Sequence, residues 1–122
     1  MLLETDFFTI SNLTTSGADV NAELIINADH KIFDGHFPGQ PVVPGVCMMQ
    51  MVKELLEQVT EQKTNLVKAH EMKFLAILDP ARNNIISAAL KYTAAENVVD
   101  VTATFFKEEL VHFKFKGQFA FL

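Results

Sequence analysis

The chain has 122 residues, the size of a single domain, and we expect residues 1–122 to form one hydrophobic core. Hydrophobic residues make up 49% and charged residues 20%, as in folded globular proteins, and no apolar run approaches the ~20 residues that span a bilayer. The net charge of −5 argues against general nucleic-acid binding. With one cysteine, no internal disulfide and no signal-like N-terminus, the expected location is the cytoplasm.

Two strands are predicted in the first 30 residues. Residues 6–16 are rich in β-branched and aromatic side chains, and residues 20–28 alternate apolar with polar side chains. Gly17 lies in the turn between them, so the pair is expected to form a hairpin.

Residues 34–50 form the least regular part of the chain. Three of the five glycines and three of the four prolines lie there, which predicts a rigid loop rather than a helix or a strand. A buried helix is expected to follow over residues 44–60, with Pro44 in its first turn. Its first half is apolar almost all round, so most of its surface must be covered.

The remainder of the chain predicts strands at residues 66–78, 84–93, 97–107 and 110–122. Short connections at residues 94–96 and 108–109 favour antiparallel hairpins. The predicted fold class is therefore α+β, with an antiparallel sheet of about six strands wrapped around one central helix.

One motif in the irregular segment carries a resemblance to a known family. It reads His36-Phe37-Pro38-Gly39-x-Pro41-x-x-Pro44-Gly45-Val46. It resembles the signature of the β-hydroxyacyl-(acyl-carrier-protein) dehydratases of fatty-acid synthesis, the FabZ/FabA type, which have the hot-dog fold. The resemblance extends more weakly over nearly the whole chain. It implies a dimer with shared active sites and the conversion of 3-hydroxyacyl thioesters to trans-2-enoyl thioesters.

The resemblance also implies roles for individual residues. His36 would be the catalytic histidine, and the amides of Gly45 and Val46 would stabilise charge on the thioester oxygen. An imidazole suits proton removal, because its unperturbed pKa of roughly 6.5 lies near working pH. Phe37, Pro38 and Gly39 would line the substrate site.

Gln50 departs from the family pattern. Fourteen positions after the histidine the family carries a Glu or Asp, and an amide cannot protonate a leaving hydroxyl as that acid does. Gln50 is expected either to contact the ligand or to be a buried polar group satisfied locally. Glu54, one turn further along the helix, is a candidate replacement acid, although it lies ~6 Å further from the helix start. Cys47 is expected in the core rather than as a nucleophile.

Three functions remain open on these grounds. The first is a 3-hydroxyacyl thioester dehydratase with a replaced proton donor. The second is a hot-dog thioesterase acting on acyl carrier protein or coenzyme A thioesters. The third is an acyl-binding subunit, weakly active or inactive alone, that pairs with an intact dehydratase.

The expected partners follow from this family. They are the acyl carrier protein or coenzyme A thioester, and a second copy of the chain or an intact dehydratase subunit; no nucleic acid, membrane, cofactor or metal is expected. Because the overall charge is negative, an acidic carrier would need a local basic patch. The residues expected to form that patch are Lys31, Lys68, Lys73 and Arg82.

Overall fold

One antiparallel sheet of six strands organises the molecule, and it is described here from a computed structural model covering residues 6–35 and 41–122. The elements in chain order are β1 (Phe8–Ser16), β2 (Asp19–Ile26), α1 (Ile32–Gly35), α2 (Gly45–Thr60), β3 (Thr64–Phe74), β4 (Ile85–Ala95), β5 (Val98–Lys107) and β6 (Leu110–Phe121). The strand order across the sheet is β1-β2-β4-β5-β6-β3. The third strand in sequence is therefore at one edge and the first at the other.

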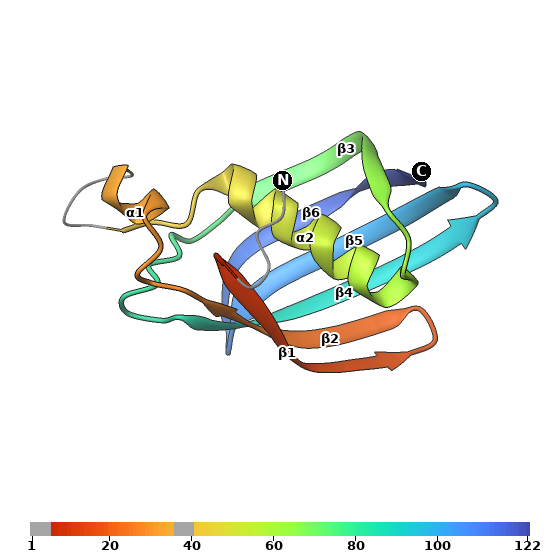
Figure 1. The fold of residues 1–122 in the computed structure, drawn as a ribbon. Helices are drawn as coiled ribbons and strands as arrows, with labels where there is room; N and C mark the ends of the chain where they lie inside the picture. Colours follow the sequence, from red (N-terminus) through yellow and green to blue (C-terminus); the bar gives the residue numbers. More distant parts are fainter. Residues whose placement is uncertain (1–5, 36–40) are drawn as a thin grey trace.

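Helix α2 lies along the concave face of this sheet, and β1 and β2 curl round it (Figure 1). Its buried side chains include Cys47, Met51 and Leu55, which belong to the same core cluster as the buried phenylalanines of β5 and β6. Phe105 and Phe113 occupy paired positions on those two strands, so both side chains point to the helix side of the sheet. The arrangement confirms the expected α+β hot-dog fold.

The connection from α2 to β3 is tight and well bonded. Glu61 caps the helix in the left-handed conformation, with φ of 57°, and its N–H donates to the carbonyl of Glu57. The Glu57 carboxylate accepts from the Thr64 backbone N–H at 2.6 Å and from the Thr64 hydroxyl at 3.1 Å. These bonds attach the first residue of β3 to the last turns of α2.

Two parts of the backbone differ from the sequence prediction. Residues 75–78, predicted as the end of a strand, lie outside β3, and the sequence did not predict the four-residue helix α1. The strand prediction extended too far because residues 74–78 are all apolar and show no alternation that would mark the end of the strand. The hairpins between β4 and β5 and between β5 and β6 are confirmed. Among the described residues, no helix combines the length and the apolar character that crossing a bilayer requires.

Candidate active site

The start of α2 presents backbone N–H groups. Pro44 is the N-cap residue, in an extended conformation, and Cys47 donates the first bond of the helix, to the Pro44 carbonyl at 3.0 Å. The amides of Gly45 and Val46 precede that bond, so they belong to the donors that a helix leaves without intrahelical partners. Such donors favour a negatively charged or polarised oxygen. The helix start can therefore take the role that the family resemblance implies for it.

Gly45 permits a close approach, and the group that approaches is an aromatic ring. A Cβ on Gly45 would lie 2.8 Å from Cε1 and Cζ of Phe74. Phe74 stacks on Phe113 with ring centroids 5.0 Å apart, while half of its own surface remains exposed. The atoms nearest to Gly45 on this side therefore belong to the Phe74 ring, and Gly45 and Phe74 both line the pocket described next.

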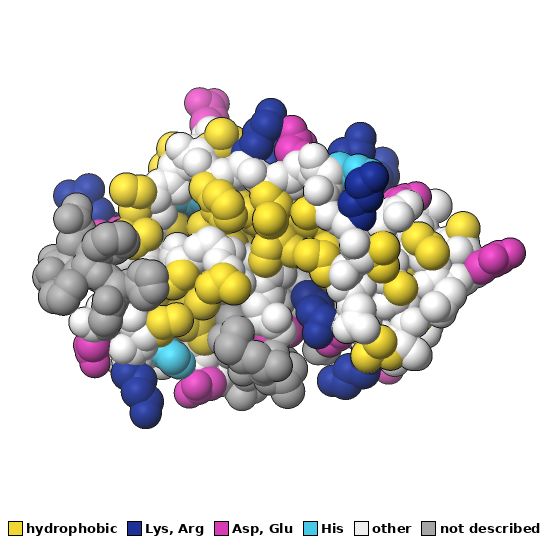
Figure 2. Space-filling view, turned by 90° about the horizontal axis from the view of Figure 1, so that it is seen from above, with side chains coloured by type: hydrophobic (Ala, Val, Ile, Leu, Met, Phe, Trp, Pro, Cys, Tyr) yellow, Lys and Arg dark blue, Asp and Glu magenta, His cyan; other side chains and the backbone are white. Residues whose placement is uncertain are grey.

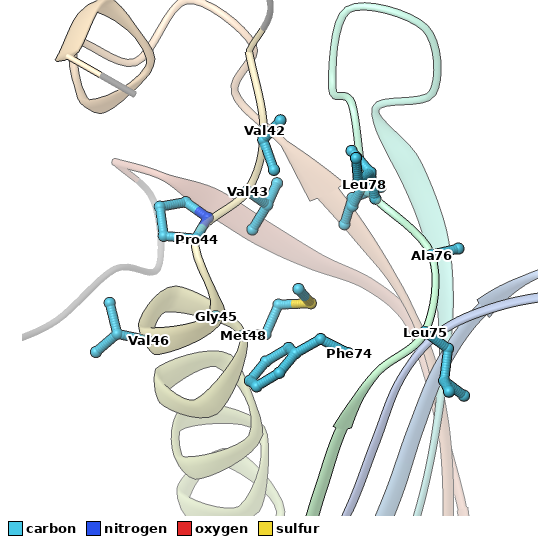
Figure 3. Close-up of a pocket in the computed structure, with 11 residues that line it drawn as sticks. Val42, Val43, Pro44, Gly45, Val46, Met48, Phe74, Leu75, Ala76 and Leu78 are labelled. Atoms are coloured by element: carbon cyan, nitrogen blue, oxygen red, sulfur yellow. The ribbon is translucent and has the colours of Figure 1, made fainter. Parts of the chain in front are cut away.

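A pocket of about 600 Å³ opens beside this contact, between the start of α2 and the segment after β3 (Figure 3). None of the described residues that line it carries a charge, and Phe74 reaches across towards Gly45 and Met48 while Val46 points away from that ring. Its dimensions and lining suit an apolar chain. The lining residues are Val42, Val43, Pro44, Gly45, Val46, Met48, Phe74, Leu75, Ala76, Ile77 and Leu78.

Hydrogen bonds hold the two walls of the pocket in place. Val43 N–H donates to the Leu78 carbonyl at 2.9 Å, which ties the segment before α2 to the segment after β3. Leu75 N–H donates to the His112 carbonyl at 2.9 Å, and Nδ1 of His112 lies 3.1 Å from the Ala76 carbonyl. His112 is buried, and its Nε2 has no hydrogen-bond partner among the residues that the structure describes. It supports the pocket wall, a role that the sequence did not predict.

Gln50 and Glu54 lie together on α2. Nε2 of Gln50 donates to Oε2 of Glu54 at 2.9 Å, across one turn of the helix. Glu54 is only 5% exposed, and Gln50 is half-buried. The position where the family carries its acid is thus occupied by an amide held against a buried carboxyl.

The expected catalytic His36, together with Phe37, Pro38 and Gly39, lies outside the described residues, so its proposed role stays a prediction. Cys47 is 1% exposed, and burial raises the pKa of its thiol, which confirms the expectation of a core cysteine. The described residues contain no cluster of three or more His, Cys, Asp or Glu side chains that could hold a metal ion.

The four residues expected at a carrier-docking patch come from three parts of the fold. Lys31 directly precedes α1, Lys68 and Lys73 lie on β3, and Arg82 lies in the segment before β4. All four are exposed, and none lines the apolar pocket. Lys73 forms an ion pair with Glu71 at 2.9 Å, and this hydrogen bond and charge lower the pKa of the Glu71 carboxyl.

The sequence did not identify Phe74 and residues 75–78 as part of the site. They are far from the helix start in sequence, and only the return of β3 alongside α2 brings them to Gly45. The apolar run before Asp79-Pro80 was a signal that could have identified this segment, because it is too apolar for an ordinary exposed loop. The run indicates that these residues pack against another part of the protein, but it does not indicate which part.

Comparison with known proteins supports the same family. The family model described as "ApeI-like: ApeI dehydratase" matches residues 12–114. A 3-hydroxyacyl-[acyl-carrier-protein] dehydratase FabZ of Idiomarina loihiensis is 28% identical over 109 residues, covering 86% of this chain and 66% of the relative. A FabZ of Mannheimia succiniciproducens is 35% identical over 57 residues, covering 47% and 37%. The chain therefore spans between about a third and two thirds of the length of these relatives.

Solved structures share the fold. A protein in "The Dehydratase Heterocomplex ApeI:P from Xenorhabdus doucetiae" superposes with a TM-score of 0.67 at 18% identity, covering 93% of this chain and 97% of that one. A conserved protein of Pseudomonas aeruginosa superposes with a TM-score of 0.65 at 11% identity, covering 93% and 88%. At these identities the likeness concerns the fold alone.

Proposed function

Because the chain belongs to the ApeI-like dehydratase family, we propose that it is a dehydratase subunit that acts on 3-hydroxyacyl thioesters of acyl carrier protein or coenzyme A. The product would be the trans-2-enoyl thioester. The observation that carries this proposal is the pocket at the start of α2, because its described lining is uncharged and it offers space for an acyl chain near the Gly45 and Val46 amides.

The proposed reaction uses those amides to stabilise charge. A base removes the proton at C2, and electron density moves to the thioester oxygen, where helix N–H groups stabilise it. The C2–C3 double bond then forms as the C3–O bond breaks, and the departing hydroxide takes up a proton to become water. From the family resemblance we assign the base to His36.

Gln50 leaves the source of that last proton open. An amide donates hydrogen bonds but does not act as an acid at neutral pH. A carboxyl from an intact dehydratase subunit would complete the site, whereas a second copy of this chain would bring Gln50 again, and one solved structure with the same fold is described as a dehydratase heterocomplex. We therefore propose that the chain works in a dimer, formed by two copies or by this chain and an intact dehydratase subunit, and that only the second arrangement supplies the carboxyl.

Strand β3 is the proposed interface. It is an edge strand of 11 residues, and long exposed edges invite pairing with another strand. Hydrophobic side chains gather along the face that contains it (Figure 2). Large apolar residues exposed on β3 or at the neighbouring helix start are Val46, Leu66, Val67, Met72 and Phe74. A partner on this side would cover them and would lie close to the pocket.

The test is product analysis with a defined substrate. The pure protein, alone and mixed with a FabZ-type subunit that carries the family carboxyl, is incubated with a 3-hydroxyacyl carrier thioester, and products are identified by mass spectrometry. We expect the enoyl thioester from the mixture and much less from the protein alone. His36→Ala should remove the contribution of this chain while leaving the fold intact.

Other products would change the assignment. Free hydroxy acid would identify a thioesterase, and the absence of both turnover and acyl binding would contradict the proposal. Binding without turnover in either sample would favour a second candidate function, an acyl-binding subunit that is inactive alone. Gln50 is consistent with that function because it lacks the acidic proton of the family residue.

A further inference from the structure

The face of the sheet opposite to α2 (Figure 1) carries a polar hollow of about 360 Å³ that the proposed reaction does not use. We propose that this hollow binds a phosphate monoester group, held by Lys91, Thr102 and Lys116. The hollow and the apolar pocket at the start of α2 share no described lining residue. The inference therefore does not depend on the proposed function.

The three residues form one row across this face. Lys91 on β4 is opposite Thr102 on β5, and Thr102 is opposite Lys116 on β6. All three are exposed, while Val101 and Ala103 beside Thr102 are buried, so the row faces away from α2. Neighbouring strands lie about 4.8 Å apart, which places the two lysine backbones about 10 Å apart with Thr102 between them. Their long side chains can converge on a ligand above Thr102.

An irregularity in the backbone of β3 forms one side of the hollow. Where β3 pairs with β6, the register shifts between Ala69 and Glu71, so His70 is the extra residue of a β-bulge. Gly117 permits this close approach, because a Cβ there would clash with the Lys68 carbonyl oxygen. His70 and Gly117 both line the hollow, and the ring of His70 adds a hydrogen-bonding group at its edge.

This face is rich in positive charge, although the chain carries a net charge of −5. The pKa of the Glu71 carboxyl reports the local field. The hydrogen bond and the charge of Lys73 lower that pKa first, and the charges of Lys114 and Lys116 lower it further. Five of the chain's ten basic residues lie on this face, namely Lys68, Lys73, Lys91, Lys114 and Lys116.

The two lysines of the row are available to a ligand. Asp100 also lines the hollow, but its Oδ1 accepts a hydrogen bond from Nε2 of Gln118 at 2.9 Å. Lys91 lies 3.7 Å from Asp19, and both side chains are more than half exposed, so this ion pair is weak. Lys116 forms no ion pair with any residue in the described part of the chain.

The charge of the row matches a phosphate monoester better than a carboxylate. A phosphate monoester carries a charge of about −1.5 to −2 at neutral pH and has three strong acceptor oxygens. Two ammonium groups balance that charge, and the Thr102 hydroxyl donates to one of the oxygens. A carboxylate carries one charge and would leave one lysine unpaired.

The first measurement titrates ¹⁵N-labelled protein with inorganic phosphate, AMP or acetate at constant ionic strength. Phosphate and AMP should give saturable shifts at the backbone amides of Thr102 and Lys116, whereas acetate should bind at least about tenfold more weakly, because it carries half the charge. Lys91→Gln/Lys116→Gln should weaken phosphate binding roughly tenfold or more. Lys63→Gln/Lys107→Gln makes the same change in net charge outside the hollow and should keep the wild-type affinity.

The second measurement separates a built site from general attraction to a positive face. Thr102→Val keeps the branched shape and removes the hydroxyl, so affinity for phosphate should fall roughly 2- to 10-fold. Thr104→Val is the matched control, because Thr104 is the next residue on the same face of β5 and does not line this hollow. If the double lysine variant does not fold, this pair of variants decides.

The ligands also distinguish two sources of the phosphate group. Tighter binding of AMP than of inorganic phosphate would support the site and identify an ester, and equal binding would support a site for free phosphate. Shifts that rise without saturation and are equal for phosphate and acetate would overturn the inference. So would equal phosphate affinity in Lys91→Gln/Lys116→Gln and Lys63→Gln/Lys107→Gln, or in Thr102→Val and Thr104→Val. No thioester is used, so failure of the proposed function leaves this test unaffected.

Discussion

At the scale of single residues, we expect Gln50 to have the largest effect on the proposed reaction. Gln50→Glu is expected to raise the rate of dehydration, because a positioned general acid contributes about 10²–10⁴-fold. The new carboxyl would take the place of the amide that now faces Glu54, and it would supply the proton donor that the amide lacks. The rate is measured with a 3-hydroxyacyl pantetheine thioester.

The double variant Gln50→Glu/Glu54→Gln, in which the two side chains exchange places, is the control for this gain in rate. Its carboxyl at position 50 has an amide neighbour instead of a second carboxyl, and a neighbouring like charge favours the protonated acid, so the rate of dehydration should rise less. If Gln50→Glu folds normally and the rate of dehydration does not rise for any acyl chain length, the site has a function other than dehydration.

Gly45 offers a second prediction at this scale. Gly45→Ala places a methyl group 2.8 Å from the Phe74 ring, so the ring must move out of its stack on Phe113. Crowding of this kind costs about 1–3 kcal/mol, and we expect the lower end because half of Phe74 is exposed. Urea unfolding measures the change.

The double variant Gly45→Ala/Phe74→Leu removes the clashing ring atoms and tests the cause. Most of the loss caused by Gly45→Ala should be absent when it is measured against Phe74→Leu alone. An equal loss in both backgrounds would show that the backbone of Gly45, and not the ring, makes alanine unfavourable there.

At the scale of elements, the link between α2 and β3 depends on Glu57. Its carboxylate accepts both bonds from Thr64 and lies 3.7 Å from the Lys53 ammonium. Glu57→Leu should reduce the free energy of unfolding by about 1–3 kcal/mol, because the buried Thr64 hydroxyl and amide lose their acceptor. Chemical denaturation measures this change in the free energy of unfolding.

Lys53→Gln is the comparison for that prediction. It removes the ion pair and leaves the two Thr64 bonds in place, so its cost should stay within about 0.5 kcal/mol. If Lys53→Gln cost as much as Glu57→Leu, the ion pair and not the hydrogen bonds would hold this connection.

At the scale of the whole molecule, the apolar edge at β3 predicts association. Val67→Lys/Met72→Lys should turn a dimer into a monomer of 13.6 kDa, because charged side chains at an edge strand oppose strand pairing. Light scattering gives the mass. Val98→Lys, on an interior strand, should leave the dimer intact. A wild type that is monomeric at micromolar concentration would contradict a shared active site.

Carrier docking is a second prediction at this scale. Lys73→Glu/Arg82→Glu should slow turnover of carrier-bound substrate and have little effect on the pantetheine substrate, since only the carrier meets the surface charges. The effect should shrink with added salt, because exposed charges are screened over ~8 Å at physiological ionic strength. Lys63→Glu, at the opposite end of α2 from the pocket, is the control. Equal carrier turnover in all three proteins would place the docking patch elsewhere.

The sequence by itself determined the elements whose reasons are local. Helix α2 was predicted from Pro44 and its apolar spacing, and it begins at Gly45 and ends at Thr60 as expected. The first strand was predicted from its β-branched and aromatic residues, and several later strands were predicted from alternation, because a sheet with one covered face repeats every two residues. The family resemblance, by contrast, came from the residue types and spacing of one motif, which indicate a reaction but not the positions of the residues in space.

Only the tertiary structure decided which distant residues meet at the helix start. Phe74 lies 29 positions after Gly45, and no local pattern indicates that its ring closes over that glycine. The burial of Glu54 was hidden for the same reason, since a carboxyl on a half-amphipathic helix segment normally faces water. Spacing placed Gln50 and Glu54 on one face of the helix, but how deeply that face is covered depends on elements that the chain brings together only when it folds.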